Sequence, residues 1–523
     1  MLMRQSEKFK AEIIDLDYRG RGIAKTDGAV VFLDDGLPGD VAEISITKAK
    51  KRFIEGHVER IITHSPKRVE AQCRYADLCG GCPLMSLDYT AQLDWKRMNI
   101  KSVISRVGET DADVLYPIAM LDPIACRNHM QFHVHNGKPC LYARDSKKLI
   151  CIDNCTVQRN AANDVLEKLI IKSVPDTLSG IGIRTNSQGK RMVIYVGTKK
   201  LTLPLAEDLA VLSDFIGEGS FYYNENPDSR EHYGLRFTHL QGEKTLTGKF
   251  MSFDYQISPS SFFQVNLAQA EKLVNSVLEM AGHCNLIYDL YCGVGTLTLP
   301  LSRTTDKIVG IEWNVGAVGD AVRNAKLNGI TNAKFVAGRV ENRLLEELKY
   351  ASCDPDLIVL DPPRAGASKE VIRSMIDIKP KKIIYVSCNP ATMARDIKIL
   401  KNHYHIDHIQ PVDMFPNTSS IETVALLSKL DVDKHINIEI ELDELDLTSA
   451  ESKATYAQIK EYVWNKFQLK VSTLYIAQIK RKCGIELREH YNKSKKEKQI
   501  IPQCTPGKEE AITDALRHFK MIE

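Results

Sequence analysis

The sequence predicts an α/β protein whose main domain is a doubly wound, Rossmann-like parallel sheet. Two observations favour this fold, and a third indicates a separate small barrel before it. From residue 256 to about 430, apolar strand-like runs alternate with helical segments, which is typical of a parallel sheet covered on both faces. One of these runs ends at two glycines two residues apart, Gly293 and Gly295. Residues 1–65 instead alternate short β-like runs with turns that contain Gly and Asp, which is typical of a small OB-type barrel.

The composition is that of a globular protein with several domains. Apolar residues make up 43% and charged residues 26% of the 523 residues. The start of the chain lacks the apolar core of a signal peptide, and no apolar run approaches 18 residues. We therefore expect a cytoplasmic protein. In that reducing compartment, the thirteen cysteines argue against a disulfide framework and for metal-binding or catalytic roles at some of them.

We expect four segments along the chain. Residues 1–65 form the barrel, and residues 66–255 form a mixed α+β central domain that contains most of the clustered cysteines. Part of 90–115 is expected to pack on the catalytic domain, which occupies residues 256–430. Residues 431–523 form an extension outside these domains.

The extension changes composition sharply along its length. Residues 431–451 carry eight acidic side chains and one lysine, as a solvated linker would. Residues 453–500 carry twelve Lys or Arg against four Glu, with aromatic residues interleaved. Several apolar residues there have helical spacing, so we expect a small helical module whose basic face contacts RNA. The net charge of the whole chain, +3, is too small to indicate nucleic-acid binding by itself.

The strand end that carries Gly293 and Gly295 predicts a nucleoside site. The strand before it ends at Asp289, and the next strand ends on Glu312, an acidic residue placed to accept hydrogen bonds from ribose hydroxyls. The third glycine of a dinucleotide fingerprint is missing. A nucleoside without a pyrophosphate, such as S-adenosylmethionine, therefore fits better than a dinucleotide.

A cluster of cysteines predicts a metal centre in the central domain. Cys73, Cys79 and Cys82 lie within ten residues, and Cys151 and Cys155 follow much later. Three such thiols can surround one soft metal centre, and either later cysteine can supply the fourth ligand. Zinc and an iron–sulfur cluster both accept four thiolates, so the spacing leaves both open.

Two further strand ends carry candidate catalytic groups. Asp361-Pro-Pro-Arg364 closes one strand, and Cys388 follows the next. Enzymes that methylate exocyclic amines usually place an aromatic residue after such prolines, so Arg364 and the nearby cysteine favour a pyrimidine carbon instead. A thiolate that adds to C6 of uracil makes C5 nucleophilic, and a carboxylate such as Glu422 can then remove the C5 proton. A buried structural thiol and a solvated strand-edge glutamate are the alternatives.

The chain resembles the RNA 5-methyluridine methyltransferases, specifically their 23S rRNA branch, from residue 1 to about 430. The similar segments are Ile257-Ser-Pro-Ser-Ser-Phe-Phe-Gln264, Asp289-Leu-Tyr-Cys-Gly-Val-Gly295, Asp361-Pro-Pro-Arg364, Val386-Ser-Cys388-Asn-Pro390 and Asp413-Met-Phe-Pro416 with Glu422.

The resemblance implies a role for each of the matching residues. Cys388 would be the nucleophile and Glu422 the base. The methyl-donor and uracil site would be lined by Gln264, Tyr291, Glu312 and Asp361. The barrel would be a TRAM domain, and a [4Fe–4S] cluster would be held by Cys73, Cys79, Cys82 and Cys155, which makes Cys151 a bystander.

Three positions depart from the family pattern. Arg339 stands where an acidic residue is common near the adenine, and Ser420 occupies a place that is often histidine. Cys126-Arg-Asn-His129 replaces the more usual Tyr-Arg-Asn-Lys. These changes concern donor affinity and RNA contacts and leave the cysteine and the glutamate in place.

The resulting hypothesis is an S-adenosylmethionine-dependent enzyme that forms 5-methyluridine in 23S rRNA. A tRNA uracil-C5 methyltransferase is the nearest alternative, and the added barrel and cysteine cluster favour the rRNA branch. A cytosine-C5 enzyme fits less well, because such enzymes usually carry a Pro-Cys element where this chain has Pro-Pro-Arg. A non-catalytic RNA-binding or ribosome-assembly factor with the same fold is an alternative of a different class. No obligate protein partner or membrane association is expected.

Overall fold

The computed structural model describes most of the chain. The described residues are 8–26, 29–49, 53–144, 146–228, 232–351, 353–430, 456–469, 471–483, 506–519 and 521–522. They belong to two compact units, one that ends at Asp431 and one that begins at Val432. No helix in these ranges is long and apolar enough to cross a membrane.

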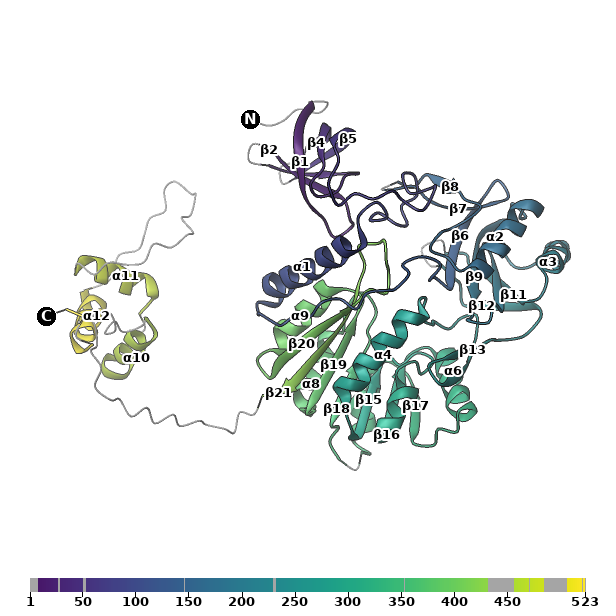
Figure 1. The fold of residues 1–523 in the computed structure, drawn as a ribbon. Coiled ribbons are helices and arrows are strands. Elements are labelled where there is room, and N and C mark those ends of the chain that lie inside the picture. The colour runs from purple at the N-terminus through teal and green to yellow at the C-terminus, as the bar shows by residue number, and fades with distance from the viewer. Residues whose placement is uncertain are drawn as a thin grey trace. The chain divides into compact units, whose positions relative to one another are not determined.

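The first unit opens with a closed five-stranded barrel, as the sequence predicted (Figure 1). Its strands are paired in the order β1-β2-β3-β5-β4 around a core that includes Ile13, Val31, Leu33 and Ile44. Their bounds are β1 Lys8–Leu16, β2 Gly22–Thr26, β3 Ala29–Leu33, β4 Val41–Ala49 and β5 Ile54–Thr63.

A seven-stranded sheet forms the centre of the next part of the chain, with the order β12-β11-β10-β9-β6-β7-β8. Side chains of two helices pack in one core with side chains of this sheet. The elements are β6 His129–His135, β7 Lys138–Tyr142, β8 Leu149–Cys151, α2 Asn160–Lys172, β9 Leu178–Thr185, β10 Arg191–Gly197, α3 Leu203–Ile216, β11 Ser220–Glu225 and β12 Arg236–Gln241.

A disulfide joins Cys140 and Cys151 in this sheet. The two residues are direct cross-strand partners in the β7–β8 ladder, which brings their side chains together. In this pairing Cys151 is not available as the fourth metal ligand that the spacing alone had left open. The general expectation against disulfides also fails at this one pair, because strand register cannot be read from cysteine spacing.

The catalytic sheet has the doubly wound topology that the sequence predicted. Its order is β17-β16-β15-β18-β19-β21-β20, with β15 to β19 parallel and β21 antiparallel to both of its neighbours. The strands are β15 Cys284–Leu290, β16 Thr305–Glu312, β17 Ala333–Ala337, β18 Leu357–Leu360, β19 Lys382–Ser387, β20 Tyr404–Val412 and β21 Glu422–Lys429. A hairpin of β13 Leu246–Phe250 and β14 Phe253–Ile257 precedes the sheet.

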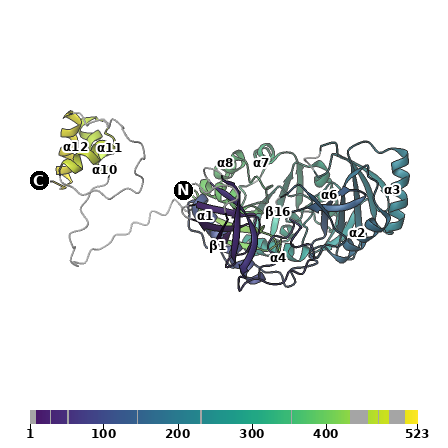
Figure 2. The same cartoon turned by 90° about the horizontal axis from the view of Figure 1, so that it is seen from above.

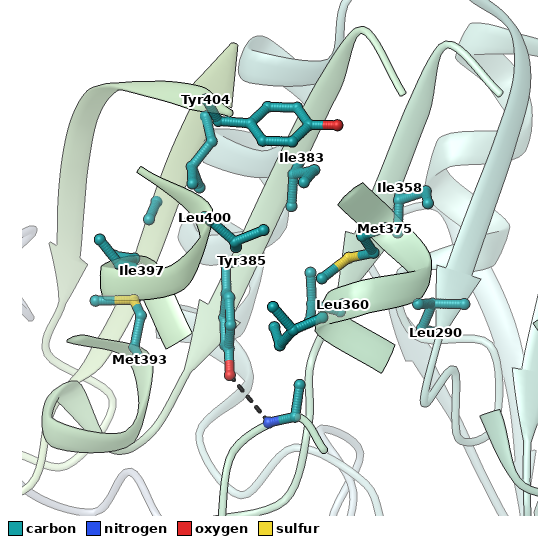
Figure 3. Close-up of a cluster of buried hydrophobic side chains, with 14 of the residues drawn as sticks. Leu290, Ile358, Leu360, Met375, Ile383, Tyr385, Met393, Ile397, Leu400 and Tyr404 are labelled. Carbon is teal, nitrogen blue, oxygen red and sulfur yellow. Dashed lines mark hydrogen bonds between the residues drawn. The ribbon is translucent and has the colours of Figure 1, made fainter. Parts of the chain in front are cut away.

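Helices cover both faces of the catalytic sheet. They are α4 Leu267–Ala281, α5 Thr298–Leu301, α6 Val315–Leu327, α7 Val340–Leu348, α8 Lys369–Ile378 and α9 Pro390–Leu400, with a short 3-10 turn at Ser302–Thr304. Side chains of β15 alternate between two cores, one shared with α4 and the other with α7, α8 and α9. Figure 2 shows α4 on one side of β16 and α7 and α8 on the other, and Figure 3 shows the second core, where Leu290, Met375 and Tyr385 pack.

Helix α1, Tyr89–Gly108, adds to that second core although it precedes the central sheet in the chain. Its Ile100 and Ile104 are fully buried with residues of α9. Lys96 Nζ lies 2.6 Å from Asp413 Oδ1, and both side chains are inaccessible to solvent. An ion pair thus fixes α1 to the segment that leads into β21.

The second unit contains three helices, α10 Tyr456–Phe467, α11 Thr473–Lys482 and α12 Pro506–His518. They share a small core in which Ile459, Val463, Ile476 and Ile512 are fully buried. The acidic linker expected at 431–451 lies outside the described residues.

Candidate active site

The candidate site lies at the carboxyl end of the catalytic sheet, where the strand order reverses. After β15 the chain adds β16 and β17 on one side of that strand, and it then returns to add β18 and β19 on the other side. Ligands of doubly wound sheets bind at this point. The loops after β15, β18 and β19 supply three of the six predicted catalytic and donor-site residues, Tyr291, Asp361 and Cys388.

The loop after β15 has the backbone geometry of a close ligand approach. Tyr291 adopts a left-handed φ of 64°, which is uncommon for a residue with a side chain. Gly295 has φ of 89°, and a Cβ there would lie 2.4 Å from Leu299 Cδ1, so no larger residue fits. Glu312 accepts hydrogen bonds from the amides of Gly293 at 3.2 Å and Asn314 at 2.8 Å. The acidic residue predicted for the ribose is thus held at the edge of this loop.

A cavity beside this loop brings together three of the four predicted donor-site residues. Gln264, Tyr291 and Asp361 all line it, and Glu312 lies next to it through its bond to Gly293. Asp289 also lines the cavity and accepts a hydrogen bond from Thr298 Oγ1 at 2.5 Å. Burial, with the charges of Asp361 and Glu312 as smaller causes, raises the pKa of Asp289 to about 7.

The segment 258–265, which carries Gln264, is held by the central sheet. Arg184 of β9 donates through Nη1 to the carbonyl of Ser261 at 2.7 Å, and Asn128 Nδ2 donates to the carbonyl of Gln264 at 2.9 Å. From the catalytic side, Asp320 accepts hydrogen bonds from Ser258 and from Ser261 Oγ. Side chains of the central part and of the catalytic part both hold this segment, so the position of Gln264 depends on both parts of the chain.

Strand register brings Cys388 and Glu422 together. The last pair of the antiparallel β19–β21 ladder is Ser387 with Thr423, and one step further along the same register places Cys388 opposite Glu422. Opposite residues of a ladder point to the same side of the sheet. Thr423 Oγ1 donates to the carbonyl of Ser387 at 3.0 Å, which closes the ladder at this end.

A second connection ties the loop of Arg364 to the cysteine. Asn389, the residue after Cys388, donates through Nδ2 to the carbonyl of Arg364 at 3.0 Å. Asn389 also caps α9 by accepting from the amide of Ala391, so the helix begins immediately after the thiol. The Asp361-Pro-Pro-Arg364 and Cys388 loops therefore form one wall of the site.

The electrostatics of the site keep its thiol protonated. Burial and then the charge of Glu422 raise the pKa of Cys388 to about 11, while Arg364 acts in the opposite direction. Burial also raises the pKa of Glu422, to which the charge of Asp361 adds and which Arg364 opposes. Glu422 Oε2 is buried and has no hydrogen-bond partner among the described residues. An unpartnered carboxylate with a raised pKa is a stronger base than a solvated one.

The four cysteines predicted to hold a cluster lie in one region. Cys73, Cys82 and Cys155 pack against the core of the central sheet, and the pKa of Cys82 is raised to about 12 by burial, with the charges of Cys155, Cys79 and Cys73 adding to it. No three His, Cys, Asp or Glu side chains within the described ranges are arranged to hold a metal ion.

Sequence reasoning missed two residues of the site. Phe262 lines the cavity with Gln264 and Tyr291 and remains 65% exposed, although it is a large aromatic residue. Its position two residues before Gln264, in the same motif, could have indicated from the sequence that it lies at the site. Arg184 gave no signal, because its partner carbonyls lie 74 and 77 residues further along the chain.

The departures from the family pattern occupy different environments. Arg339 is exposed at the N-cap of α7, directly after Gly338, whose amide donates to the carbonyl of Glu312. Cys126 is buried. Ser420 is half-buried, and its amide donates to Thr418 Oγ1 at 3.2 Å.

The sheet order and the site at its reversal define the chain's catalytic part as a Rossmann-like methyltransferase domain. Residues 88–430 match the family model of the tRNA (uracil-5-)-methyltransferases, and residues 5–58 match the TRAM domain. The chain belongs to this family of RNA uracil-C5 methyltransferases, and its barrel is a TRAM domain, as the resemblance implied.

Relatives and a solved structure agree with this assignment. An uncharacterized RNA methyltransferase from Caldanaerobacter subterraneus subsp. tengcongensis is 34% identical over 449 residues, which are 81% of this chain and 98% of the relative. Another from Clostridium acetobutylicum is 33% identical over 82% of this chain and 98% of its own length. The crystal structure of the Pyrococcus abyssi tRNA (uracil-54, C5)-methyltransferase with S-adenosyl-L-homocysteine has a TM-score of 0.64 and 29% identity, and covers 80% of this chain and 99% of its own.

Proposed function

We propose that the chain transfers a methyl group from S-adenosylmethionine to C5 of a uridine in 23S rRNA, with Cys388 as nucleophile and Glu422 as base. The observation that supports the proposal is the β19–β21 ladder, whose last pair, Ser387 and Thr423, directly precedes Cys388 and follows Glu422 in the chain. The charge of Asp361, which lines the cavity, acts on the side chains of both Cys388 and Glu422. The reaction needs a nucleophile and a base that act on one ring.

The donor site consists of the residues around the loop after β15. Glu312 is the acceptor for the ribose hydroxyls, while Gln264, Tyr291 and Asp361 line the cavity. The left-handed Tyr291 and Gly295 let the backbone come close to the nucleoside. The Pyrococcus abyssi structure, which contains the demethylated donor, supports the choice of this cofactor.

The chemistry requires a covalent intermediate. The sulfur of Cys388, as thiolate, forms a bond to C6, and the C5–C6 π electrons move into an enolate that spans C5, C4 and O4. C5 then takes the methyl group from the donor sulfur, which leaves as the neutral thioether. Glu422 removes the remaining C5 proton, the C5–C6 double bond re-forms, and the thiolate of Cys388 is expelled.

The protonation states set a condition for this sequence. With a pKa of about 11, Cys388 is a thiol at neutral pH before the RNA binds. The thiol must therefore lose its proton when the target uracil enters the site. Arg364 favours the thiolate, and the N-terminus of α9 that follows the cysteine acts in the same direction.

The target base must leave its stack to reach Cys388. Base flipping costs a few kcal/mol, which contacts inside the site have to offset. Phe262, exposed at the cavity, is placed to stack on the flipped ring. An RNA substrate of this kind places the enzyme in the cytoplasm.

The cysteine group supports an additional cofactor. We assign a [4Fe–4S] cluster to Cys73, Cys79, Cys82 and Cys155, which would organise the RNA-binding part of the chain. Methyl transfer involves no change of oxidation state, so no step of the reaction passes through the cluster.

The choice of 23S rRNA rests on the resemblance to that branch of the family. A tRNA substrate is the competing assignment, which the Pyrococcus abyssi neighbour favours. Nucleoside mass spectrometry of rRNA and tRNA from a deletion strain, mapped to position, decides between them. Loss of 5-methyluridine from 23S rRNA alone supports the proposal, and loss from tRNA alone contradicts it. A non-catalytic assembly factor would leave both RNAs unchanged and would not turn over labelled donor.

A further inference from the structure

The three-helix unit at the C-terminus lies outside everything that the family explains. The family match ends at residue 430, and the relatives described above match about four-fifths of this chain with almost their whole length. The activity that the family shares therefore does not explain what this unit does. Its function has to be argued from its own side chains.

Helix α10 has a polar and aromatic stripe beside its buried face. Ile459 and Val463 are fully buried in the unit's core. Lys460, Trp464 and Phe467 follow at i, i+4 and i+7, so they form one stripe along another side of the helix. Trp464 is 43% and Phe467 37% exposed, which is a high exposure for two neighbouring aromatic rings in so small a unit.

Helix α11 adds positive charge. Gln468, directly after α10, has the left-handed conformation at φ of 54°, and Ser472 caps α11 by accepting from the amide of Tyr475 at 3.2 Å. Ile476 and Ile479 face the core, whereas Arg481 and Lys482 in the last turn are exposed, and Lys482 also forms an ion pair with Glu509 of α12.

The chemistry of these faces selects the partner. Protein interfaces are depleted in lysine, whereas surfaces that bind unpaired nucleotides combine lysine or arginine with exposed aromatic rings. Over residues 453–500 twelve Lys or Arg stand against four Glu, although residues 431–451 carry eight acidic side chains. The positive charge is thus concentrated in the part of the chain that also carries the exposed rings.

We propose that the C-terminal unit is a second RNA-binding module, in which Trp464 and Phe467 stack on unpaired bases while Lys460, Arg481 and Lys482 contact phosphates. The module adds affinity for RNA away from the methylated base. Its binding does not depend on the identity of the methylated nucleotide, so the inference stands or falls separately from the proposed reaction.

The test compares variants of the full-length chain by fluorescence anisotropy with a labelled single-stranded U20 RNA. W464A/F467A should weaken binding at least about tenfold, because each lost base–aromatic stack costs on the order of 1–3 kcal/mol. R481E/K482E should weaken binding and lower the slope of log affinity against log salt by about 1 to 2, since about one unit is lost per phosphate contact. The control N465A changes an exposed α10 residue outside the stripe and should bind as the parent does.

Two readouts keep the result interpretable. Circular dichroism and thermal unfolding establish that each variant retains the helices. Turnover at saturating RNA should stay unchanged in all three variants, whereas the RNA concentration needed for half-maximal rate should rise in the first two. A 20-bp RNA duplex should respond less to W464A/F467A, because its bases are already stacked.

Unchanged affinity and salt slope in folded W464A/F467A and R481E/K482E would overturn the proposal and favour a protein partner for this face. A loss confined to the duplex would overturn the stacking role. If no variant and no parent protein methylates RNA but the affinity losses appear, the proposed reaction fails and the RNA-binding module stands.

Discussion

Arg184 of the central sheet donates to the carbonyl of Ser261, 2.7 Å away, in the segment that carries the cavity-lining residues Phe262 and Gln264. The guanidinium is buried, and its Nε has no hydrogen-bond partner within the described residues. Arg184 is thus a positioning residue that couples the central sheet to the cavity. A buried guanidinium that binds backbone carbonyls of one segment indicates that the position of this segment matters.

The first prediction follows from that contact. Arg184→Gln should lower kcat/KM by roughly 10- to 100-fold, since a hydrogen bond from a charged group contributes about 1.5–3 kcal/mol. The loss should appear mainly as a higher KM for the donor and a lower rate of methyl transfer to uracil. RNA affinity measured without donor should stay near the parent value. Arg191→Gln, on the neighbouring strand β10, is the matched control. Equal losses for both variants, or a loss of RNA affinity alone, would show that Arg184 does not position the segment.

The second prediction concerns the buried pair of Lys96 and Asp413. Burial lowers the pKa of Lys96, and Asp413 opposes this shift. Lys96→Met leaves the Asp413 carboxylate buried, with Tyr89 Oη at 2.9 Å as its one remaining side-chain partner among the described residues. The change should cost about 3–5 kcal/mol of unfolding free energy. The double variant K96M/D413N should lose less than the sum of the two single variants.

Urea unfolding measures these differences, with Lys101→Met on the same helix as control. A K96M protein whose unfolding free energy lies within about 0.5 kcal/mol of the parent would contradict the prediction, since that is the range of ordinary surface substitutions.

The third prediction concerns Glu422 and pH. Because burial raises its pKa above the ordinary value of 4.5, the folded protein binds this proton more tightly than the unfolded chain. Stability from this group is present at low pH and is lost as the pH rises above about 4.5, where the unfolded chain ionises first. Glu422→Gln should therefore be more stable than the parent by about 1–3 kcal/mol at pH 8, with a smaller difference at pH 5.

Thermal unfolding of both proteins between pH 5 and pH 8 gives this difference directly. Glu279→Gln, at an exposed position of α4, should show no pH-dependent gain. If the difference for Glu422→Gln were constant or fell with pH, the carboxyl group would not have the raised pKa on which its role as base depends.

The fourth prediction concerns the cysteine group. Protein purified without oxygen should contain about four iron and four acid-labile sulfide per chain and absorb broadly in the visible range. Cys79→Ser should lose iron and sulfide, whereas Cys353→Ser, at an exposed cysteine elsewhere, should keep them. Stoichiometric zinc without sulfide in the anaerobic parent protein would refute the cluster.

Several parts of this molecule could be predicted from sequence because their signals are local. The turns and alternation of residues 1–65 predicted the barrel, and the strand ends at Asp289 and Glu312 predicted the switch-point site. The pairing of Cys140 with Cys151 could not be predicted, because it depends on which strands become neighbours. The contact of Arg184 with Ser261 has the same cause: it joins two domains that are distant in the chain.

The role of Glu422 lies between these cases. Its spacing alone indicated a solvated strand-edge residue, and only the resemblance implied a base. The β19–β21 register and the buried Oε2, which has no partner among the described residues, support the proposed role. Sequence spacing cannot report burial at a strand end, because burial there depends on the loops of Arg364 and Cys388.

The central claim is tested most directly by comparing the covalent adducts of two variants on denaturing electrophoresis, using RNA substrate and donor with a labelled methyl group. Glu422→Gln keeps the nucleophile but loses the base, so a protein–RNA species that carries the methyl label should accumulate. Cys388→Ala should form neither adduct nor 5-methyluridine, because nothing activates C5. A folded Glu422→Gln protein that turns over normally, or a Cys388→Ala protein that still forms the labelled adduct, would contradict the mechanism.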